Sequence, residues 1–450
     1  MARVGAGERN RRNQLLCFHR FADLEVLCTT LAPMSKDAPG TRRAALPRAV
    51  WIYFTAVAFT GIGFIAAFTV GTVAIFVITE SRGLTGLPAA IGTIGTAAGA
   101  ALLSTIMARR GRRLGLLVGL AAGVVGGILA VAALALTASV LPALLLLFGA
   151  FVGFGFANAA AQLSRYAAAD LVAAVDRGRA VGTVVWAGTI GAVVGPNLPN
   201  LVAPSEGTPG VGDLMIGFAA VGVVMLAAMI VLAVFLRSEP PPSAPEPAES
   251  SGALPLRVGE VLRLPGIRIG LIALVVSGVS MIALMSMTPV HLIEAGHGMS
   301  LIGLVLSAHT LGMFALSPVS GRLADRFGPV PVVMGGLAVV AGAGILAAIA
   351  PASGGLVLIT ALFLLGFGWN LAFVSGSTLV ARDTPAQIRI RVQGLTDAAF
   401  WSSAAAGSAL AGVMLELTSY GLLALVATGL ALLAIGLVAV QRRAPVPARA

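Results

Sequence analysis

Apolar stretches long enough to cross a membrane recur along the chain from about residue 50 to residue 440. A helix of about 20 mostly apolar residues spans a hydrocarbon core of about 30 Å. The runs are continuous and do not alternate between apolar and polar positions, which excludes a membrane β-barrel. The pattern predicts an all-α membrane protein with twelve transmembrane helices, at 50–79, 87–108, 114–136, 141–163, 180–203, 214–236, 269–290, 300–320, 329–350, 355–380, 393–415 and 420–440.

Polar segments divide this pattern into domains. Residues 237–268 are rich in Pro, Ser and Glu, a composition that cannot bury a core. We expect residues 1–33 to be a mis-called or disordered extension, since Met34 begins a second candidate start. The predicted order is a disordered N-terminal segment at 1–49, a six-helix bundle at 50–236, a linker at 237–268, a second six-helix bundle at 269–440 and a tail at 441–450.

The basic residues predict the orientation in the membrane. Short cytoplasmic loops carry an excess of Lys and Arg. With the N-terminus inside, the cytoplasmic segments hold 28 of the 29 basic residues, and only Arg82 lies outside. The outside loops hold five acids, namely Glu80, Glu206, Asp213, Glu294 and Glu416. We therefore expect a multi-pass protein of a bacterial cytoplasmic membrane with both termini in the cytoplasm.

Composition and charge exclude several classes of protein. Only 10% of the residues are charged, against about a quarter in soluble domains. The basic residues that give the net charge of +11 lie where membrane topology requires them and can contact anionic lipid. No nucleic-acid partner is therefore expected. The two cysteines, Cys17 and Cys28, exclude a disulfide scaffold. We find no phosphate-binding loop and no catalytic triad, and we expect neither an enzyme nor a cofactor.

The two halves of the chain repeat each other. Gly153-Phe154-Gly155 matches residues 366–368 at an offset of 213. The pattern R-x-R-x-x-G begins at Arg177 and again at Arg389, an offset of 212. The segment at 108–113 faces the segment at 324–329, and Gly111 matches Gly328 at an offset of 217. Three matches in order predict a six-plus-six duplication, which is one known transporter architecture.

The segment GRLADRFG at 321–328 resembles the cytoplasmic loop motif of the major facilitator superfamily, and it lies where that family has its second copy. The first copy is degenerate, because Ala108 stands where the family has Asp. The resemblance covers roughly residues 50–440. It implies two pseudo-symmetric six-helix bundles, and a gating role for Gly321, Asp325, Arg326 and Gly328, with Gly111 and Arg112 in the first copy.

The fifth span resembles the antiporter motif of drug:proton antiporters in the same superfamily. Gly182, Gly191, Gly195 and Pro196 fit its first part, G-x8-G-x3-G-P, but Pro199 and Asn200 replace the closing Gly-Gly. Glycines four apart permit close helix packing, and proline kinks a helix. Ordinary small-residue packing explains the same pattern, so the motif favours antiport without requiring it.

Asp397 is the strongest candidate for a functional group inside the membrane. It is the one acid in the interior of a predicted span, and ionisable groups at that depth usually face the bundle interior. Gln393, Asp397 and Trp401 share one helix face, with Phe400 nearby. The carboxylate is expected either to bind protons or substrate, or to pair with Arg389, Arg391 or a basic loop residue of the first half.

Other polar groups in the spans are further candidates for the cavity. The fourth span carries Asn158, Gln162 and Arg165, and the resemblance links an arginine in this span to proton transfer. Arg165 lies late in its span and could instead reach toward the cytoplasm. Trp369 and Asn370 need hydrogen-bond partners or substrate, and His309 either titrates or packs.

These features predict a monomeric secondary transporter for a small molecule, coupled to protons. Export of small amphipathic compounds is the first hypothesis, and uptake of a metabolite or vitamin is the second. A receptor or scaffold that kept the fold without transport is the alternative from another class. An apolar, sealed cavity favours the scaffold, whereas an accessible cavity with Asp397, Asn158 and Asn370 favours transport. His291, Glu294 and His297 lie in an outside loop, and no metal site is predicted.

Overall fold

The twelve predicted spans are all present as helices. The computed structural model describes residues 45–80, 84, 87–203, 210–236, 264–295, 299–350 and 355–443, and every regular element in these ranges is helical. The expected N-terminal extension, most of the linker, and Arg82, Glu206 and His297 lie outside the described residues. The spans run Arg48–Thr79, Leu87–Arg110, Arg112–Ala135, Val140–Asp170, Ala174–Val202, Val211–Phe235, Pro265–Leu292, Leu301–Phe327, Pro329–Ala348, Gly355–Asp383, Arg389–Leu417 and Tyr420–Gln441.

The first half of the fold contains six spans, and its helices pack through small residues. In α5 the position of Gly153 leaves no room for a Cβ against the backbone of Ala122, and Gly119 and Gly123 of α4 approach α5 in the same way. Such rows of glycine let helix backbones come close together in a membrane. The elements are α2 (Arg48–Thr79), α3 (Leu87–Arg110), α4 (Arg112–Ala135), α5 (Val140–Asp170), η2 (Ala174–Asp176), α6 (Arg177–Val194), η3 (Gly195–Asn197), α7 (Leu198–Val202) and α8 (Val211–Phe235).

The second half repeats this plan with its own glycine contacts. Gly366 of α14 lies against the backbone of His309, and Gly336 of α13 against that of Gly368. The chain order of the halves corresponds, so α14 in the second half takes the place that α5 has in the first. The elements are α10 (Pro265–Glu294), α11 (Met299–Phe314), α12 (Ser317–Phe327), α13 (Pro329–Ala348), α14 (Gly355–Asp383), α15 (Arg389–Leu417) and α16 (Tyr420–Arg443).

Two spans are interrupted. The fifth changes from α6 to a 3-10 turn at Gly195, where Pro196 lacks the N–H that would continue the helix. The eighth was predicted as one continuous helix, but it breaks between Phe314 and Ser317 because Pro318 begins the next helix and restricts the residue before it. The gating motif was expected to form a loop at 321–328. It is helical as far as Phe327, and the turn is confined to Gly328, whose φ is +83°.

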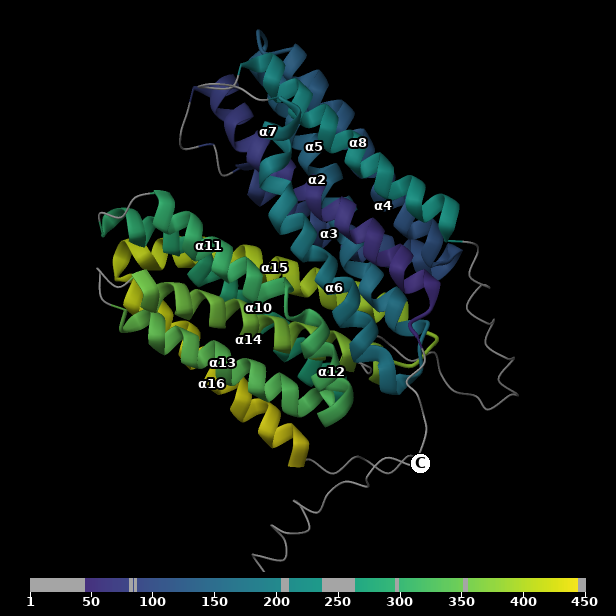
Figure 1. Cartoon of the computed structure of the whole chain (residues 1–450), viewed down its shortest axis with the longest axis vertical. Helices are drawn as coiled ribbons and strands as arrows, with labels where there is room; N and C mark the ends of the chain where they lie inside the picture. Colours follow the sequence, from purple (N-terminus) through teal and green to yellow (C-terminus); the bar gives the residue numbers. More distant parts are fainter. Residues whose placement is uncertain are drawn as a thin grey trace, which may run out of the picture. The chain divides into compact units, whose positions relative to one another are not determined.

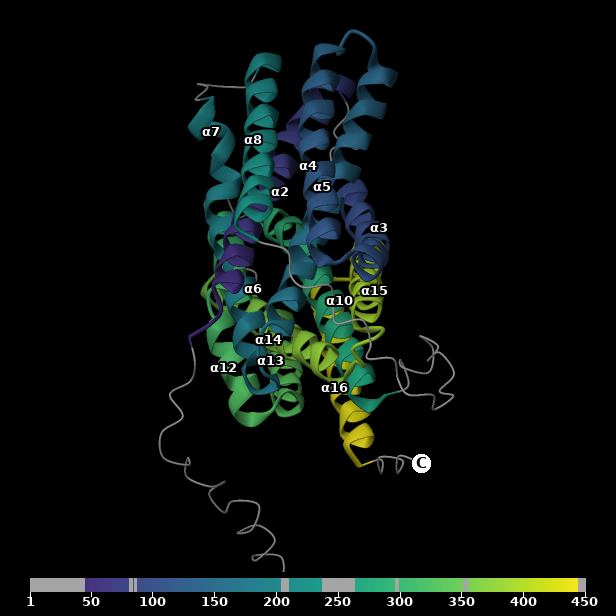
Figure 2. The same cartoon turned by 90° about the vertical axis from the view of Figure 1, so that its right-hand side faces the viewer.

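The two halves touch mainly at one end of the helices. Figure 1 shows the first half in purple to teal and the second in green to yellow, with α6 beside α12 where they meet. Figure 2 shows α3 beside α15 at the same level. The helix ends at this level carry the arginines of residues 109–113, 177–179, 322–326 and 389–391. We call this the arginine-rich end.

Candidate functional site

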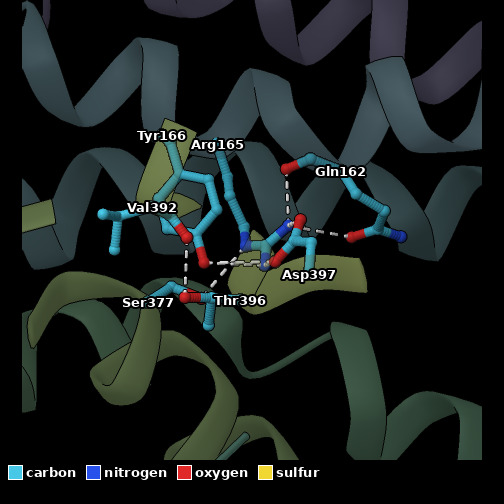
Figure 3. A network of polar contacts seen from close by, with 7 residues as sticks. All are labelled: Gln162, Arg165, Tyr166, Ser377, Val392, Thr396 and Asp397. Atoms are coloured by element: carbon cyan, nitrogen blue, oxygen red, sulfur yellow. Dashed lines mark hydrogen bonds and ion pairs between the residues drawn. The ribbon is translucent and has the colours of Figure 1, made fainter. Parts of the chain in front are cut away.

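A buried ion pair joins the two halves. Arg165 of α5 donates from Nη2 to Oδ1 of Asp397 at 2.6 Å and from Nη1 to Oδ2 at 3.0 Å (Figure 3). Asp397 belongs to α15, so the pair is a two-pronged contact between a helix of the first half and a helix of the second. The side chains are 2% and 0% exposed. Removing one partner of such a buried pair typically costs about 3–5 kcal/mol, because the other charge is left uncompensated.

The surroundings of this pair satisfy most of its hydrogen-bonding groups. Arg165 donates from Nε to Oγ of Ser377 at 3.0 Å and from Nη1 to the backbone oxygen of Gln162 at 2.5 Å. The hydroxyl of Tyr166 is 3.2 Å from Oδ1 of Asp397. The guanidinium carbon also lies 4.4 Å from the ring centroids of both Tyr166 and Phe373, close enough for cation–π attraction. The arginine is therefore held in one orientation.

Arg165 of this pair lies at the wall of a cavity between the halves, whereas Asp397 is not among the residues that line it. Arg165 and Gln162 of the first half line this cavity, as do Trp369 and Trp401 of the second. The cavity has a volume of about 100 Å³ and is partly open to solvent. It is smaller than the roughly 300–1,000 Å³ of sites for drug-sized ligands. The three residues predicted to share one face of α15 make different contacts. Gln393 accepts a hydrogen bond from Arg112, Asp397 pairs with Arg165, and Trp401 lines the cavity.

Three predicted cavity residues instead hold helices together. Asn370 of α14 donates to the backbone oxygen of Met313 and to Oγ of Ser317, both at 2.6 Å. It therefore satisfies polar groups on both sides of the break in the eighth span. Asn158 donates to Oγ1 of Thr96 at 3.3 Å, and Nδ1 of His309 is 2.8 Å from the backbone oxygen of Leu362. None of these three is among the residues that line the cavity described above.

At the arginine-rich end, Asp325 of α12 caps the first turn of α6. Its Oδ1 accepts from the backbone N–H of Gly178 and its Oδ2 from that of Arg179, both at 2.8 Å. The first N–H groups of a helix have no partner within the helix, and they carry partial positive charge. The approach depends on glycine, because a Cβ on Gly178 would lie 2.6 Å from Oδ1 of Asp325 and from the backbone oxygen of Gly321.

The corresponding contact of the other repeat, between α3–α4 and α15, uses side chains. Arg112 of α4 forms an ion pair with Asp170 at the end of α5 and donates to Oε1 of Gln393 at 2.9 Å. Arg389 of α15 reaches the same carboxylate at 3.4 Å. Gly394 packs so tightly on Ser104 of α3 that a Cβ would overlap it. Arg112 begins α4 directly after Gly111, which has φ +90°.

The glycines of the fifth span serve close packing. A Cβ on Gly191 would lie 2.8 Å from the backbone of Gly61 in α2, and one on Gly195 would lie 2.8 Å from Cβ of Ile65. Gly182 faces the other half, against the backbone oxygen of Ser317. The pattern read as an antiporter motif thus positions α6 between α2 and α12.

Sequence reasoning missed several residues of the site. Asp397 was given Arg389, Arg391 or a loop residue as its partner, but the partner is Arg165, which is buried rather than directed to the cytoplasm. The internal repeat could have pointed to Ser377, because the offset of 212 between the halves makes it the counterpart of Arg165 in the sequence. Tyr166 and Phe373 carry no such signal, since their contacts depend on how the two halves meet. Among the described residues no cluster of three metal-ligating side chains occurs.

A fold of two six-helix halves with a buried charge pair beside a central cavity defines a membrane transporter of small molecules. A family model described as the Major Facilitator Superfamily matches residues 52–301 and 296–450. The chain therefore belongs to the major facilitator superfamily, whose members are transporters and not enzymes.

Two relatives support this assignment. The chain is 34% identical over 409 residues to the uncharacterized MFS-type transporter YddS of Bacillus subtilis (strain 168), covering 89% of this chain and 92% of the relative. It is 30% identical over 350 residues to the riboflavin transporter RfnT of Brucella anthropi, covering 75% and 82%.

The structural similarity extends to proteins of low sequence identity and therefore concerns the fold alone. The human organic anion transporter MFSD10 superposes with a TM-score of 0.68 at 18% identity, over 87% of this chain and all of that one. A bacterial homologue of the iron transporter ferroportin in an outward-facing state gives 0.67 at 15% identity, over 88% and 100%.

Proposed function

We propose that the chain is a proton-coupled secondary transporter that exports small amphipathic compounds by alternating access. The observation that carries this proposal is the buried ion pair between Arg165, at the wall of the cavity, and Asp397, with one residue from each half. A proton-coupled carrier needs a group that changes its charge during the cycle. Arginine stays protonated in proteins, so Asp397 is the group that takes up the proton.

Protonation of Asp397 would weaken the contact between the halves. The ionised carboxylate accepts hydrogen bonds from Arg165 and is also in contact with the hydroxyl of Tyr166. A proton removes the negative charge and turns one oxygen into a donor that faces donors of the guanidinium. The halves can then rock apart at this level, while Tyr166, which belongs to the same helix as Arg165, still contacts the arginine. A substrate bound beside Arg165 in the cavity would oppose this rearrangement. Binding of the proton and binding of the substrate would then affect each other, which couples the movement of one to that of the other.

The contacts at the arginine-rich end supply the gate. Asp325 holds α12 on α6 in the described conformation, and Arg326 and Gly328 complete the motif whose gating role the family resemblance implies. Gly111 and Arg112 have the equivalent place in the first repeat. With the N-terminus in the cytoplasm, the arginine-rich end faces inward and this conformation is outward-facing. We place the protein as a monomer in the bacterial cytoplasmic membrane, with both termini inside.

Uptake of a metabolite or vitamin is the second candidate. The observation that favours it is the 30% identity to the riboflavin transporter RfnT over 82% of that protein. Uptake would use the same ion pair, but substrate and proton would then enter together instead of exchanging.

Transport in vesicles of both orientations distinguishes the two directions. Riboflavin and ethidium are offered to inverted vesicles with an acidic interior and to right-side-out vesicles in an acidic medium. Export predicts gradient-driven accumulation in the inverted vesicles, and uptake predicts it in the right-side-out ones. Asp397→Asn should abolish gradient-driven accumulation but keep exchange without a gradient. Asp213→Asn, which changes a partly exposed acid that caps the start of α8 far from the ion pair, is the matched control and should behave as wild type.

A conformational measurement tests coupling without any substrate. Val175 and Phe327 are 62% and 57% exposed and lie on either side of the α6–α12 contact. Spin labels at these positions in nanodiscs should move apart as the medium is acidified, and they should stop responding to pH in Asp397→Asn. A pH response that persists unchanged in this variant would contradict the coupling role. Loss of thermal stability together with both transport modes would indicate that the pair is structural.

A further inference from the structure

The cavity has two chemically different walls. The second half contributes a continuous row of aromatic rings. Trp369 and Phe373 are stacked with ring centroids 4.5 Å apart, Phe373 is 5.6 Å from Phe400, and Phe400 is 5.1 Å from Trp401. Phe314 of α11 extends the row at its contact of 6.0 Å with Trp369. All five rings line the cavity.

Apart from Gln162 and Arg165, the residues that the first half contributes to the lining are aliphatic and short. They include Val57 of α2, Ala161 of α5, and Val184, Val185 and Gly188 of α6. At Gly188 the two walls converge, since a Cβ there would lie 2.6 Å from Cδ1 of Phe314. Aromatic rings prefer offset-stacked or edge-to-face contact with another ring, so a wall of aromatic rings opposite short side chains suits a ligand that is itself aromatic and therefore flat.

The charge of the cavity lining is balanced. Among the described residues that line the cavity, Arg165 alone carries a charge. Both of its Nη atoms donate to Asp397. A cationic ligand would find no free carboxylate here, and an anionic ligand would have to displace Asp397 from the guanidinium. Burying an unpaired charge is unfavourable, so the lining favours an uncharged ligand.

One hydrogen-bond donor at the cavity has no acceptor. Trp369 is 4% exposed, and its Nε1 is buried without a partner among the described residues. A buried N–H without an acceptor destabilises the protein by about as much as a lost hydrogen bond. An acceptor on a ligand lying against this wall would remove that penalty.

We propose that the cavity binds a flat, uncharged aromatic or heteroaromatic molecule that lies along the row from Phe314 to Trp401 and accepts a hydrogen bond from the indole N–H of Trp369. A ligand of this kind would be the substrate class of the transporter, so its physiological meaning rests on the proposed function. Binding itself is a separate property, which can be measured without any gradient.

The test measures equilibrium binding to the full chain in nanodiscs by calorimetry. The probes are lumichrome, which is flat, uncharged and rich in carbonyl acceptors, ethidium, which is flat and cationic, and 1-adamantanol, which is uncharged but not flat. We expect lumichrome to bind at least about tenfold more tightly than either of the others. Equal or tighter binding of ethidium or adamantanol, or no binding of lumichrome, would overturn the proposal.

Two substitutions sharpen the test. Trp369→Phe keeps an aromatic ring but removes the N–H, and it should weaken lumichrome binding roughly 3- to 10-fold, as expected for one hydrogen bond. Trp51→Phe makes the same change at a side chain 48% exposed on α2 and should leave binding unchanged. An unchanged affinity in Trp369→Phe, with the thermal melting of wild type, would refute the role of this donor.

Asp397→Asn separates this inference from the proposed function. The variant leaves Arg165 without its counter-ion, so 2-naphthoate, a flat anion, should bind it more tightly than it binds wild type. No gain in affinity for 2-naphthoate would contradict the charge balance that the inference requires. Lumichrome binding by a wild-type protein that shows no proton-driven transport would refute the proposed function alone. Proton-driven transport of ethidium without lumichrome binding would refute the substrate class alone.

Discussion

The two repeats close the arginine-rich end with the same geometry but different chemistry. Where α12 meets α6, Gly182 lies on the backbone of Ser317, and the carboxylate of Asp325 caps the helix one turn away. Where α3 meets α15, Gly394 lies on Ser104 in the corresponding way, but Ala108 stands one turn away. Both repeats have the close approach of the helices, and only the α6–α12 contact has the carboxylate cap.

The difference has an energetic consequence. On the α6–α12 side, a charged group accepts hydrogen bonds from fixed backbone N–H groups, which involves little side-chain freedom on the donor side. On the α3–α15 side, Asp170 connects Arg112 and Arg389 through long side chains and is 21% exposed. Partly exposed pairs of this kind are worth less than charge-assisted bonds to backbone. We therefore expect the α6–α12 contact to hold the closed state more strongly.

The largest effect is expected from Asp325→Asn. The amide keeps one acceptor but places an NH₂ group opposite a backbone N–H of α6, and it loses the favourable charge at the helix N-terminus. The combined loss is about 2–4 kcal/mol, so the spin-label distance between positions 175 and 327 should shift to the separated state and turnover should change. The protein should still be made and inserted. A wild-type distance and wild-type transport would remove Asp325 from the gate.

The second effect is expected from Gly182→Ala. The new methyl group would overlap the backbone oxygen of Ser317, which cannot rotate away. Overpacking typically costs about 1–3 kcal/mol, and here it falls only on the conformation in which α6 and α12 touch. The same label pair should report separation.

Two glycine variants serve as comparisons for Gly182→Ala. Gly394→Ala overlaps the side chain of Ser104 and also the backbone oxygen of Ala100, so a second substitution, Ser104→Gly, should restore the closed distance only in part. Gly412→Ala faces open space and should have no effect. An equal response of Gly182→Ala and Gly412→Ala would mean that the contact does not limit the closed state.

The third effect is expected from Asp170→Asn. This change removes the charge that Arg112 and Arg389 share, at a cost of about 1 kcal/mol because the network is partly exposed. Labels at Arg109 and Gln387, both exposed, should show a modest separation that high salt reproduces in wild type. A larger response here than in Asp325→Asn would reverse the comparison between the two contacts.

The sequence predicts the part of this molecule that depends on local composition. The twelve spans follow from apolar length, and the duplication follows from Gly182 and Gly394 within repeated patterns. Asp397 stands out because an acid is costly at its depth. Its partner could not be assigned in this way, because Arg165 and Asp397 are 232 residues apart and meet only through the packing of α5 against α15. The break between Phe314 and Ser317 was not predicted, because the apolar residues on both sides of Pro318 look like one continuous helix.

The smallest effect is expected from restoring the missing acid with Ala108→Asp. Ala108 is exposed and lies one helical turn beyond Ser104, just as Asp325 lies one turn beyond Gly321. The first turn of α15 at residues 389–391 corresponds to residues 177–179 of α6, so the new carboxylate would face helix N–H groups and their partial positive charge. Such a contact is worth about 0.3–1 kcal/mol. The distance between labels at Arg109 and Gln387 should become slightly shorter and less sensitive to Asp170→Asn, whereas Ala108→Asn should give less of this rescue. If Ala108→Asp instead separates the labels, the two contacts differ in backbone geometry as well as in chemistry, and the loss of the acid in the first repeat followed from that difference.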